Sequence, residues 1–228
     1  MYTNAQSIIK KMDELKVVAN MVKPDVIALT ETWTNDQIDN SFLNVEGYEV
    51  VARDDREDTE KGRGGGVLIY VKKTLCAWKV DVGGDFCQCK GIKIKGKKRD
   101  IALYVVYRSP NSSAQNDEKL CSVLKTLRGQ FVLIGDLNFP GIRWETGGCD
   151  AKSRSFYEIV VESCLSQHVE VPTHVSGNIL DLIITKDEEL VHSVDVGGRL
   201  GKSDHEMVTA VLNIDLIVDE RIEYARDF

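Results

Sequence analysis

The stretch QFVLIGDLNFPGI, residues 130–142, joins a short apolar run to a polar loop. Phe131 to Ile134 form a continuous apolar segment with β-branched members, which predicts a strand buried on both faces. Asp136 and Asn138 follow where this run ends. Enzymes built on sheets place reactive side chains at such strand ends, because the strand fixes their position and the loop gives access. Gly, Asp, Asn and Pro also favour turns, so a purely structural turn is an equal alternative for this stretch taken alone.

The composition is that of an ordinary globular protein. Of 228 residues, 43% are hydrophobic and 29% charged, which suits one large domain or two small ones. The net charge of −7 provides no overall field that attracts nucleic acid or an anionic membrane, so a polyanionic substrate would need local basic loops or a bound cation. Six cysteines without a CxxC pair indicate reduced thiols of an intracellular protein. No segment is apolar and long enough for a secretion signal or membrane span.

Apolar periodicity predicts more strands than helices. A helix capped by Ser7 is expected over 8–22, and two more over 116–127 and 152–165. The charge run at 53–61 and the basic turn at 95–100 are expected to be a solvated loop and a hairpin tip. Strands are predicted at 26–29, 48–52, 67–71, 75–82, 88–94, 101–107, 131–134, 169–171, 180–185, 191–196 and 207–216. With helices dispersed among strands and no internal linker, we expect one domain of two sheets packed face to face, with helices outside.

Five of the predicted strands begin or end at polar side chains of the kinds found in active sites. Each could be a turn or cap residue, and that is the commoner role for any one of them taken singly. Their joint occurrence favours a shared site. The residues are Glu31, Tyr107, Asp136 with Asn138, Asp181, and Asp204 with His205.

The segments around these residues resemble an ordered set of family motifs. LTETW at 29–33, YRSPN at 107–111, GDLN at 135–138, LDLIIT at 180–185 and SDH at 203–205 resemble the endonuclease/exonuclease/phosphatase superfamily, which includes DNase I and apurinic endonucleases. TNAQSI at 3–8, the ETW and RGGGVLIYV at 63–71 resemble more closely the endonuclease domain of LINE-type (non-LTR) retrotransposons. The resemblance covers nearly the whole chain. It implies an α/β (α+β) fold with four layers, an α/β/β/α sandwich of two mostly antiparallel sheets.

The resemblance implies a role for each matched residue. Asn4 corresponds to an early active-site asparagine, Glu31 to the main divalent-metal ligand, and Asp204 to a metal ligand or its support. Tyr107 corresponds to a tyrosine that contacts the scissile phosphate. These matches imply a hydrolase that depends on Mg²⁺, with Mn²⁺ as the alternative cation.

The remaining matches concern the attacking water and the phosphorus. Asp136 corresponds to the residue that orients or deprotonates the water, and Asn138 to the amide that holds the water or the phosphate. Asp181 would orient His205, which would stabilise the pentavalent phosphorus. The chemistry of the residues agrees, because a histidine beside a carboxylate is readily protonated and Mg²⁺ prefers hard oxygen ligands.

Contacts to DNA are expected from individual basic side chains and from the loops around the motifs. Arg108 and Thr173 are candidates for binding phosphate, with solubility as the alternative role of the arginine. Trp33, Trp144 and His174 could touch bases or sugars, although packing is the commoner role of such residues. Other basic residues in loops near the motifs are Arg143, Arg154, Arg199 and Lys202.

Residues 1–217 are expected to form the catalytic domain, and 218–228 the start of a connector to a downstream domain. Family members usually have a full strand before the early asparagine, whereas only Met1 to Thr3 precede Asn4, so we expect that strand to be truncated. The resemblance implies DNA as a partner, a reverse transcriptase domain in the same polyprotein, and an intracellular protein that acts in the nucleus.

The function implied first is a metal-dependent endonuclease that nicks DNA and leaves a 3′-hydroxyl usable as a primer. One alternative is a decayed, inactive domain that keeps the fold, which a truncated strand would favour. Another is a phosphatase or phosphodiesterase acting on inositol phosphates or sphingomyelin, which the retrotransposon-like ETW and RGGGVLIYV segments disfavour.

Overall fold

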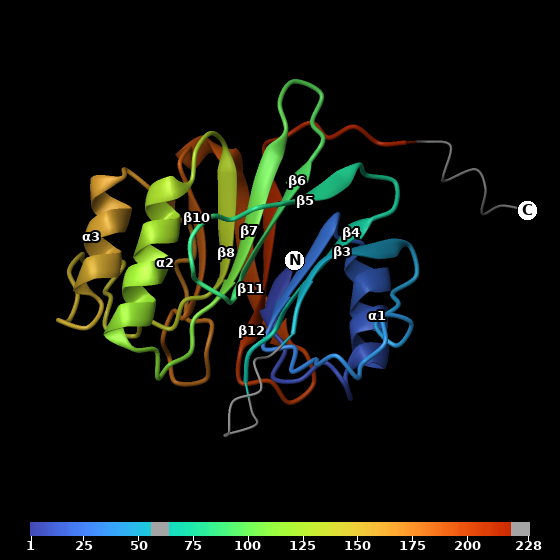
Figure 1. The fold of residues 1–228 in the computed structure, drawn as a ribbon, viewed down its shortest axis with the longest axis horizontal. Helices are drawn as coiled ribbons and strands as arrows, with labels where there is room; N and C mark the ends of the chain where they lie inside the picture. The colour runs from blue at the N-terminus through green and yellow to red at the C-terminus, as the bar shows by residue number, and fades with distance from the viewer. Residues whose placement is uncertain (56–63, 220–228) are drawn as a thin grey trace, which may run out of the picture.

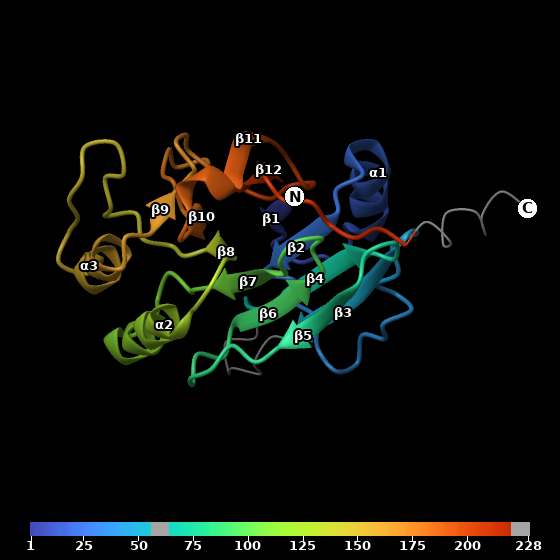
Figure 2. The same cartoon turned by 90° about the horizontal axis from the view of Figure 1, so that it is seen from above.

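The computed structural model describes residues 1–55 and 64–219. It shows two six-stranded sheets packed face to face, with helices against their outer faces (Figures 1 and 2). This confirms the predicted α/β sandwich. The predicted solvated loop at 53–61 lies mostly outside the described residues, and so does the connector from residue 220 onward.

The first sheet contains the first and the last strand of the described chain. Its strand order is β11-β12-β1-β2-β4-β3, and β1 pairs in parallel with β2 and antiparallel with β12. The three residues of β1 thus lie in the middle of this sheet. The strands are β1 (Tyr2–Asn4), β2 (Val26–Thr30), β3 (Tyr48–Asp54), β4 (Val67–Lys72), β11 (Val191–Arg199) and β12 (Glu206–Leu212).

The second sheet has the order β5-β6-β7-β8-β10-β9, and only its β7–β8 pair is parallel. Its strands are β5 (Ala77–Val80), β6 (Cys89–Ile94), β7 (Ile101–Tyr107), β8 (Phe131–Asp136), β9 (Ser166–Gln167) and β10 (Asp181–Thr185). The strand predicted at 169–171 is wrong, because the short edge strand β9 lies before it. Strand β9 pairs with Ile184 and Thr185 of β10.

In the described part of the chain, three α-helices cover the outer faces, and a 3₁₀ turn (Glu188–Leu190) precedes β11. Helix α1 (Met12–Val22) lies on the first sheet, and α2 (Ala114–Thr126) and α3 (Arg154–Glu162) lie on the second (Figure 2). The predicted start of α1 is wrong. Ser7 has a left-handed φ of 75°, and the helix begins five residues later, after Lys11.

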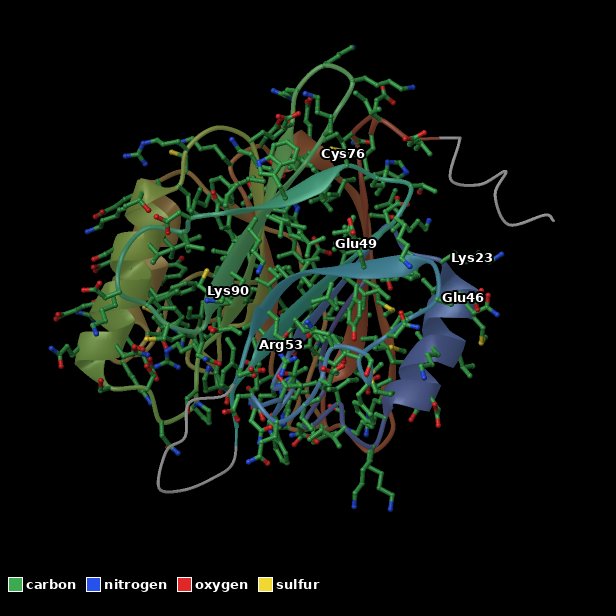
Figure 3. The ribbon with its side chains drawn as sticks, turned by 45° about the vertical axis from the view of Figure 1, so that its right-hand side comes forward. Lys23, Glu46, Glu49, Arg53, Cys76 and Lys90 are labelled. Carbon is green, nitrogen blue, oxygen red and sulfur yellow. The ribbon has the colours of Figure 1, made fainter. Side chains whose placement is uncertain are left out.

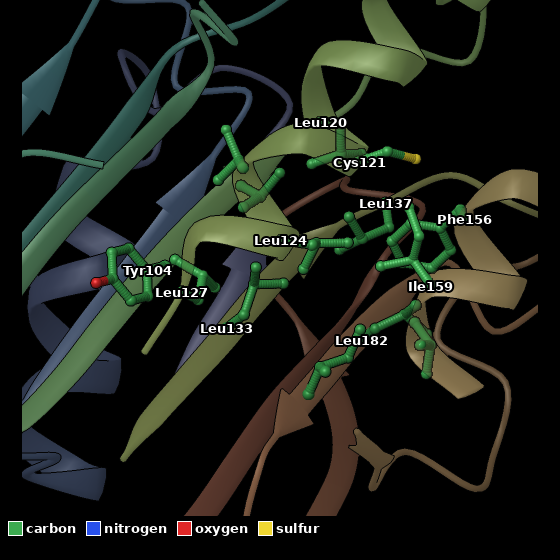
Figure 4. Close-up of a cluster of buried hydrophobic side chains, with 14 of the residues drawn as sticks. Tyr104, Leu120, Cys121, Leu124, Leu127, Leu133, Leu137, Phe156, Ile159 and Leu182 are labelled. Carbon is green, nitrogen blue, oxygen red and sulfur yellow. The ribbon is translucent and has the colours of Figure 1, made fainter. Parts of the chain in front are cut away.

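The alternation of side chains along the buried strands builds three apolar layers. In β2, Ile27 and Leu29 face α1, while Ala28 faces the other sheet. In β8, Leu133 faces α2 and α3, where it packs with Leu124 (Figure 4). A strand with apolar residues on both faces therefore lies between two layers, which is why these segments are continuous apolar runs rather than alternating ones.

The β3 edge of the first sheet carries charged residues (Figure 3). Glu49 is exposed, and Arg53 binds the carbonyl oxygens of Asn35 and Ile38, at 2.6 and 2.8 Å, which fixes the loop after β2. Lys90 of β6 lies 3.1 Å from Asp54 and links the two sheets at this edge. Charged side chains on an edge strand oppose pairing with another chain.

The strand register and the glycine before it determine the position of Asp136. It pairs with Tyr107 of β7 on one side and with Asp181 of β10 on the other. A Cβ on Gly135 would lie 1.8 Å from the carbonyl oxygen of Val106. Only glycine therefore allows β8 to approach β7 closely enough to bring these three side chains into one row.

Candidate active site

The predicted site residues meet where β1, β2 and β12 of one sheet face β7, β8 and β10 of the other. The amide of Asn4 connects the two sheets, because its Nδ2 donates to Oδ2 of Asp136 at 2.9 Å and lies 3.4 Å from Oε1 of Glu31. Asn4 is fully buried, and its carbonyl oxygen accepts a hydrogen bond from the Ser203 hydroxyl at 2.8 Å. A residue near the start of the chain thus holds the segment that carries His205.

His205 is held by carboxylates on two sides. Its Nδ1 lies 2.7 Å from Oδ2 of Asp181, and its Nε2 lies 3.9 Å from Oδ2 of Asp136 and 3.6 Å from Oδ1 of Asp204. Burial by itself would lower the pKa of His205, but the hydrogen bond and charge of Asp181, with the charges of Asp136 and Asp204, raise it to about 9. The ring is therefore an imidazolium at neutral pH.

Asp136 is a buried carboxylate with one oxygen unused. Burial and the charge of Asp181 raise its pKa well above the usual range, and His205 and the Asn4 hydrogen bond offset only part of this. Among the described residues, its Oδ1 has no hydrogen-bond partner. A buried oxygen without a partner costs free energy, so Oδ1 is suited to accept from a bound water or to contact a cation.

Glu31 and Tyr107 form a pair at the ends of β2 and β7. Glu31 has a left-handed φ of 48°, and its Oε2 accepts from the Trp33 indole at 3.0 Å. The Tyr107 hydroxyl is hydrogen-bonded to Glu31, and burial together with the Glu31 charge raises the pKa of Tyr107 far above its usual value. Tyr107 is therefore a neutral donor. Left-handed backbone at a non-glycine residue is a strain that often accompanies a functional position.

Asn138 also has a left-handed backbone, with φ 53°, and a buried arginine holds it there. Nη1 of Arg108 donates to the carbonyl oxygen of Asn138 at 2.8 Å, and Nε and Nη2 each bind a carboxylate oxygen of Asp117 at 2.7 Å. The guanidinium also stacks 3.9 Å from the centre of the Phe139 ring. Arg108 is fully buried, so the prediction that it contacts DNA is wrong.

Thr173 is likewise fully buried, which contradicts its predicted phosphate contact. Its hydroxyl accepts from the backbone N–H groups of Leu180 and Asp181, both at 3.1 Å. It therefore fixes the entry of the chain into β10. Both errors share one cause, because a polar residue beside a motif can serve the backbone of that motif instead of the substrate.

Asp204 is held by two side chains that the motif analysis did not place in the site. Its Oδ1 accepts from Gln6 at 2.5 Å, and its Oδ2 lies 3.3 Å from Nε2 of His174. Sequence reasoning assigned no role to Gln6 and offered His174 only as a contact to bases or sugars, with packing as the commoner role. Tyr2, whose hydroxyl donates to Oδ1 of Asp181 at 2.8 Å, was also missed. For Gln6 and Tyr2, the available signal was their position within two residues of Asn4.

Two groups of possible metal ligands occur among the described residues. In each group, one ligand atom from every member lies within 4.8 Å of the others: Asp136, Asp181 and His205 in one, and His174, Asp204 and His205 in the other. Glu31 belongs to neither group. The site therefore has acidic oxygen ligands, but it does not bring together the predicted metal pair of Glu31 and Asp204 in one tight cluster.

The basic residues predicted to follow DNA lie in different places. Arg143, Arg154, Arg199 and Lys202 are exposed, and Lys202 lies two residues before Asp204. Arg199 is paired with Glu206 at 2.7 Å. The basic turn at 95–100 joins β6 to the start of β7, whereas Tyr107 ends β7, so this turn lies at the opposite end of the sheet from the site (Figure 1).

The chain belongs to the Endonuclease/Exonuclease/phosphatase family, whose pattern it matches over residues 2–205. The fold and the motif residues at one end of the two sheets agree with this membership. Members of this family are hydrolytic nucleases or phosphatases. No curated protein matches the chain. Within the described part of the chain, none of the helices has the length and apolar character needed to span a bilayer.

Several solved structures have the same fold. The endonuclease domain of TRAS1, a telomere-specific non-LTR retrotransposon, is 18% identical with a TM-score of 0.69, over 96% of this chain and 97% of that one. An AP endonuclease from Archaeoglobus fulgidus is 17% identical with a TM-score of 0.70, over 93% and 98%. The 3′ phosphatase NExo from Neisseria, bound to a product DNA hairpin, is 16% identical with a TM-score of 0.67, over 93% and 98%.

Proposed function

We propose that the protein is a divalent-metal-dependent endonuclease that hydrolyses one phosphodiester bond of DNA and leaves a 3′-hydroxyl. The observation that carries the proposal is the buried row in which a protonated His205 lies between Asp181 and Asp136, with Oδ1 of Asp136 free to accept. A cation and a base side by side suit attack of water on an anionic phosphate. Family membership and the fold shared with a retrotransposon endonuclease support it.

The residues fit a hard divalent cation such as Mg²⁺ or Mn²⁺. Glu31 is partly exposed and offers carboxylate oxygens at the mouth of the site, and Asp204 offers a second carboxylate. One or two carboxylates suffice for Mg²⁺, which keeps several of its waters. When bound, the cation would neutralise negative charge on the phosphoryl oxygens and on the leaving oxygen. We assign Glu31 and Asp204 to hold it, with Asp204 acting directly or through a water.

The protein's own side chains divide the rest of the reaction. Asp136 accepts the proton of the attacking water through Oδ1, and its raised pKa makes its ionised form a stronger base than an ordinary aspartate. His205 donates from Nε2 to a phosphoryl oxygen as negative charge builds up on it. The P–O3′ bond breaks as the bond from phosphorus to the water oxygen forms, and the departing 3′ oxygen takes up a proton from solvent, which gives a 5′-phosphate and a 3′-hydroxyl.

Three neutral groups orient the phosphate and the water. The Tyr107 hydroxyl and the Asn138 amide are placed at the ends of β7 and β8, beside Asp136, and we assign both to the scissile phosphate or the water. Asn4 holds Asp136 in the orientation that leaves Oδ1 free. These groups act by fixed hydrogen bonds in a buried site, where such bonds are stronger than in water.

The cellular role follows from the product. A nicked strand ending in a 3′-hydroxyl can prime DNA synthesis, so we propose that the domain cleaves the target site of a non-LTR retrotransposon. In that role it acts in the nucleus and is joined to a reverse transcriptase in one polyprotein. Exposed Arg143, Arg154, Arg199 and Lys202 are the candidates for contacts to the DNA backbone.

A plasmid-nicking assay tests the proposal. The wild-type protein should convert supercoiled plasmid to the nicked form with Mg²⁺ and not with EDTA. Glu31→Ala and His205→Ala should each lower the rate on the order of 10²-fold or more. His192→Ala and Glu49→Ala, at exposed positions outside the site, are matched controls that should retain the wild-type nicking rate. Extension of the nick by a DNA polymerase reports the 3′-hydroxyl.

Three outcomes would contradict parts of this assignment. Nicking that survives chelation or both site substitutions would overturn the mechanism. Folded protein that removes a 3′-terminal phosphate from DNA but does not nick it would make the protein a phosphatase. Folded protein inactive on both substrates would identify a domain that has kept the fold and lost the chemistry.

A further inference from the structure

His174 has no role in the mechanism above, yet it packs directly against the site. It lies in the loop between β9 and β10 and forms an isolated antiparallel bridge with His205. The two imidazole rings meet edge to face, with centres 4.8 Å apart and planes at 68°. The side chain of His174 is 19% exposed. One face of the catalytic histidine is therefore covered by a second histidine.

The surroundings of His174 determine which ring nitrogen carries the proton. Its Nδ1 accepts a hydrogen bond from the backbone N–H of Ser176 at 3.1 Å, so this nitrogen presents a lone pair. The Ser176 hydroxyl lies 2.7 Å from the same Nδ1, within reach to donate to that lone pair, and its oxygen accepts from Nδ2 of Asn178 at 2.8 Å. In the neutral ring the proton is consequently on Nε2.

The protonated Nε2 faces a carboxylate of the site. It lies 3.3 Å from Oδ2 of Asp204, while Oδ1 of Asp204 accepts from Nε2 of Gln6. The Gln6 side chain also accepts from the backbone N–H of Asp204 at 3.2 Å. The two carboxylate oxygens are thus held by two different side chains that lie far apart in the sequence.

We propose that His174 is a positioning residue that donates from Nε2 to Asp204 and fixes the orientation of that carboxylate. The inference rests on the proposed function, in which Asp204 supports the divalent cation. A histidine that orients an acidic group in this way acts through Asp204 and makes no contact with the DNA.

A direct metal-binding role for His174 disagrees with this geometry. A histidine that coordinates a metal needs a lone pair on the coordinating nitrogen and usually donates from its other nitrogen. Here the nitrogen that faces Asp204 and His205 carries the proton, and the other nitrogen accepts. The His174, Asp204 and His205 group is therefore a hydrogen-bonded arrangement.

Nitrogen NMR of the histidine side chains tests the contact without DNA or activity. At neutral pH, in EDTA, His174 should show an unprotonated Nδ1 and a protonated Nε2, assigned by comparison with His174→Gln. The Asn178→Ala variant should retain this tautomer, because the Ser176 backbone donor remains. A protonated Nδ1 would overturn the inference, whether or not the protein proves to be a nuclease.

Steady-state kinetics tests the consequence. His174→Ala should lower kcat, or raise the Mg²⁺ concentration needed for half-maximal nicking, by about 10- to 100-fold, as is typical for partners of metal ligands. The KM for DNA should stay within about twofold. His174→Gln, whose amide can still donate to Asp204, should recover most of the loss, whereas His174→Phe keeps a ring against His205 and should not.

Two kinetic results would contradict the inference. A raised KM for DNA at unchanged kcat and Mg²⁺ dependence would make His174 a substrate contact. Equal activity of His174→Gln and His174→Phe would show that the ring contact matters and the hydrogen bond does not. His192→Ala, an exposed histidine on β11, serves as the control that should match wild type. A wild-type protein that does not nick, but has the expected tautomer, would overturn the proposed function alone.

Discussion

The Tyr2 hydroxyl donates to Oδ1 of Asp181 at 2.8 Å, across the interface between the two sheets. The same hydroxyl lies 2.8 Å from Oγ1 of Thr30, and the other oxygen of Asp181 lies 2.7 Å from His205. Burial and the Asp181 charge raise the pKa of Tyr2 well above its usual value, so the hydroxyl stays protonated. The carboxylate that binds the His205 ring is thus itself oriented from the opposite sheet.

Tyr2→Phe should lower the free energy of unfolding by about 1–3 kcal/mol, because it leaves one oxygen of a buried charge without a partner. Urea denaturation measures the loss. Tyr48→Phe is a matched control, since its hydroxyl binds the backbone carbonyl of Pro24 at a distance from the site. A Tyr2→Phe protein as stable as wild type would show that Asp181 does not depend on this hydrogen bond.

Stability should fall as the pH rises through about 9. The pKa of His205 is raised to about 9 in the folded protein, compared with about 6.5 when unfolded. The folded state therefore binds the extra proton, so this contribution is complete below about pH 6.5 and is lost as the pH passes 9. Denaturation in EDTA from pH 6 to 10 measures the slope.

Two variants identify the residue responsible for that slope. His205→Gln should be less stable than wild type at pH 6.5 and should lose most of the decline above pH 8. His192→Ala should keep the full decline in stability above pH 8. If the slope is unchanged in His205→Gln, the imidazolium assigned to the site is wrong.

Gly135→Ala should destabilise the fold by more than about 3 kcal/mol or prevent folding, since the new Cβ would lie 1.8 Å from a backbone carbonyl. Soluble yield and thermal denaturation test this. Gly197→Ala is the control, because a Cβ there meets nothing within 4 Å. A well-folded Gly135→Ala protein would show that β7 and β8 can separate without loss.

Arg108→Ala should cost about 3–5 kcal/mol, because it removes a fully buried guanidinium together with its ion pair to Asp117 and its hydrogen bond to Asn138. Arg108→Lys should restore only part of the lost stability, because an ammonium cannot bind Asp117 with two parallel hydrogen bonds and also reach Asn138. The salt dependence of DNA binding should not change in a variant that still folds. A shallower salt dependence would instead support the contact between Arg108 and DNA that its burial contradicts.

The fold was predictable because its signals are local. Continuous apolar runs that end at a carboxylate identified β2 and β8, an apolar run that contains Asp181 identified β10, and helical periodicity identified α2 and α3. The start of α1 was not predictable in the same way. Ser7 is a good cap by residue type, but residues 5–8 are bonded to the backbone after β2, which delays the helix. That constraint comes from a strand two elements away.

The candidate site was predictable as a set of residues but not as a set of contacts. Motif resemblance located Asp136, Asp181 and His205, and the structure brings them together. Arg108 and Thr173 lie beside motif residues in the sequence, and only the three-dimensional structure shows that they face inward. The roles of Gln6 and His174 depend on Asp204, about 200 and 30 residues away. No local pattern can report such pairs.

The division of the site between the two sheets also determines when activity can appear. Asn4 is the last residue of β1, His205 lies directly before β12, and both lie close to Asp136 at the end of β8. A chain that has been synthesised only as far as β11 has Glu31 and Asp136 but lacks the His205 ring. A nuclease of the proposed kind is therefore inactive until His205 has been synthesised and the two sheets have packed together.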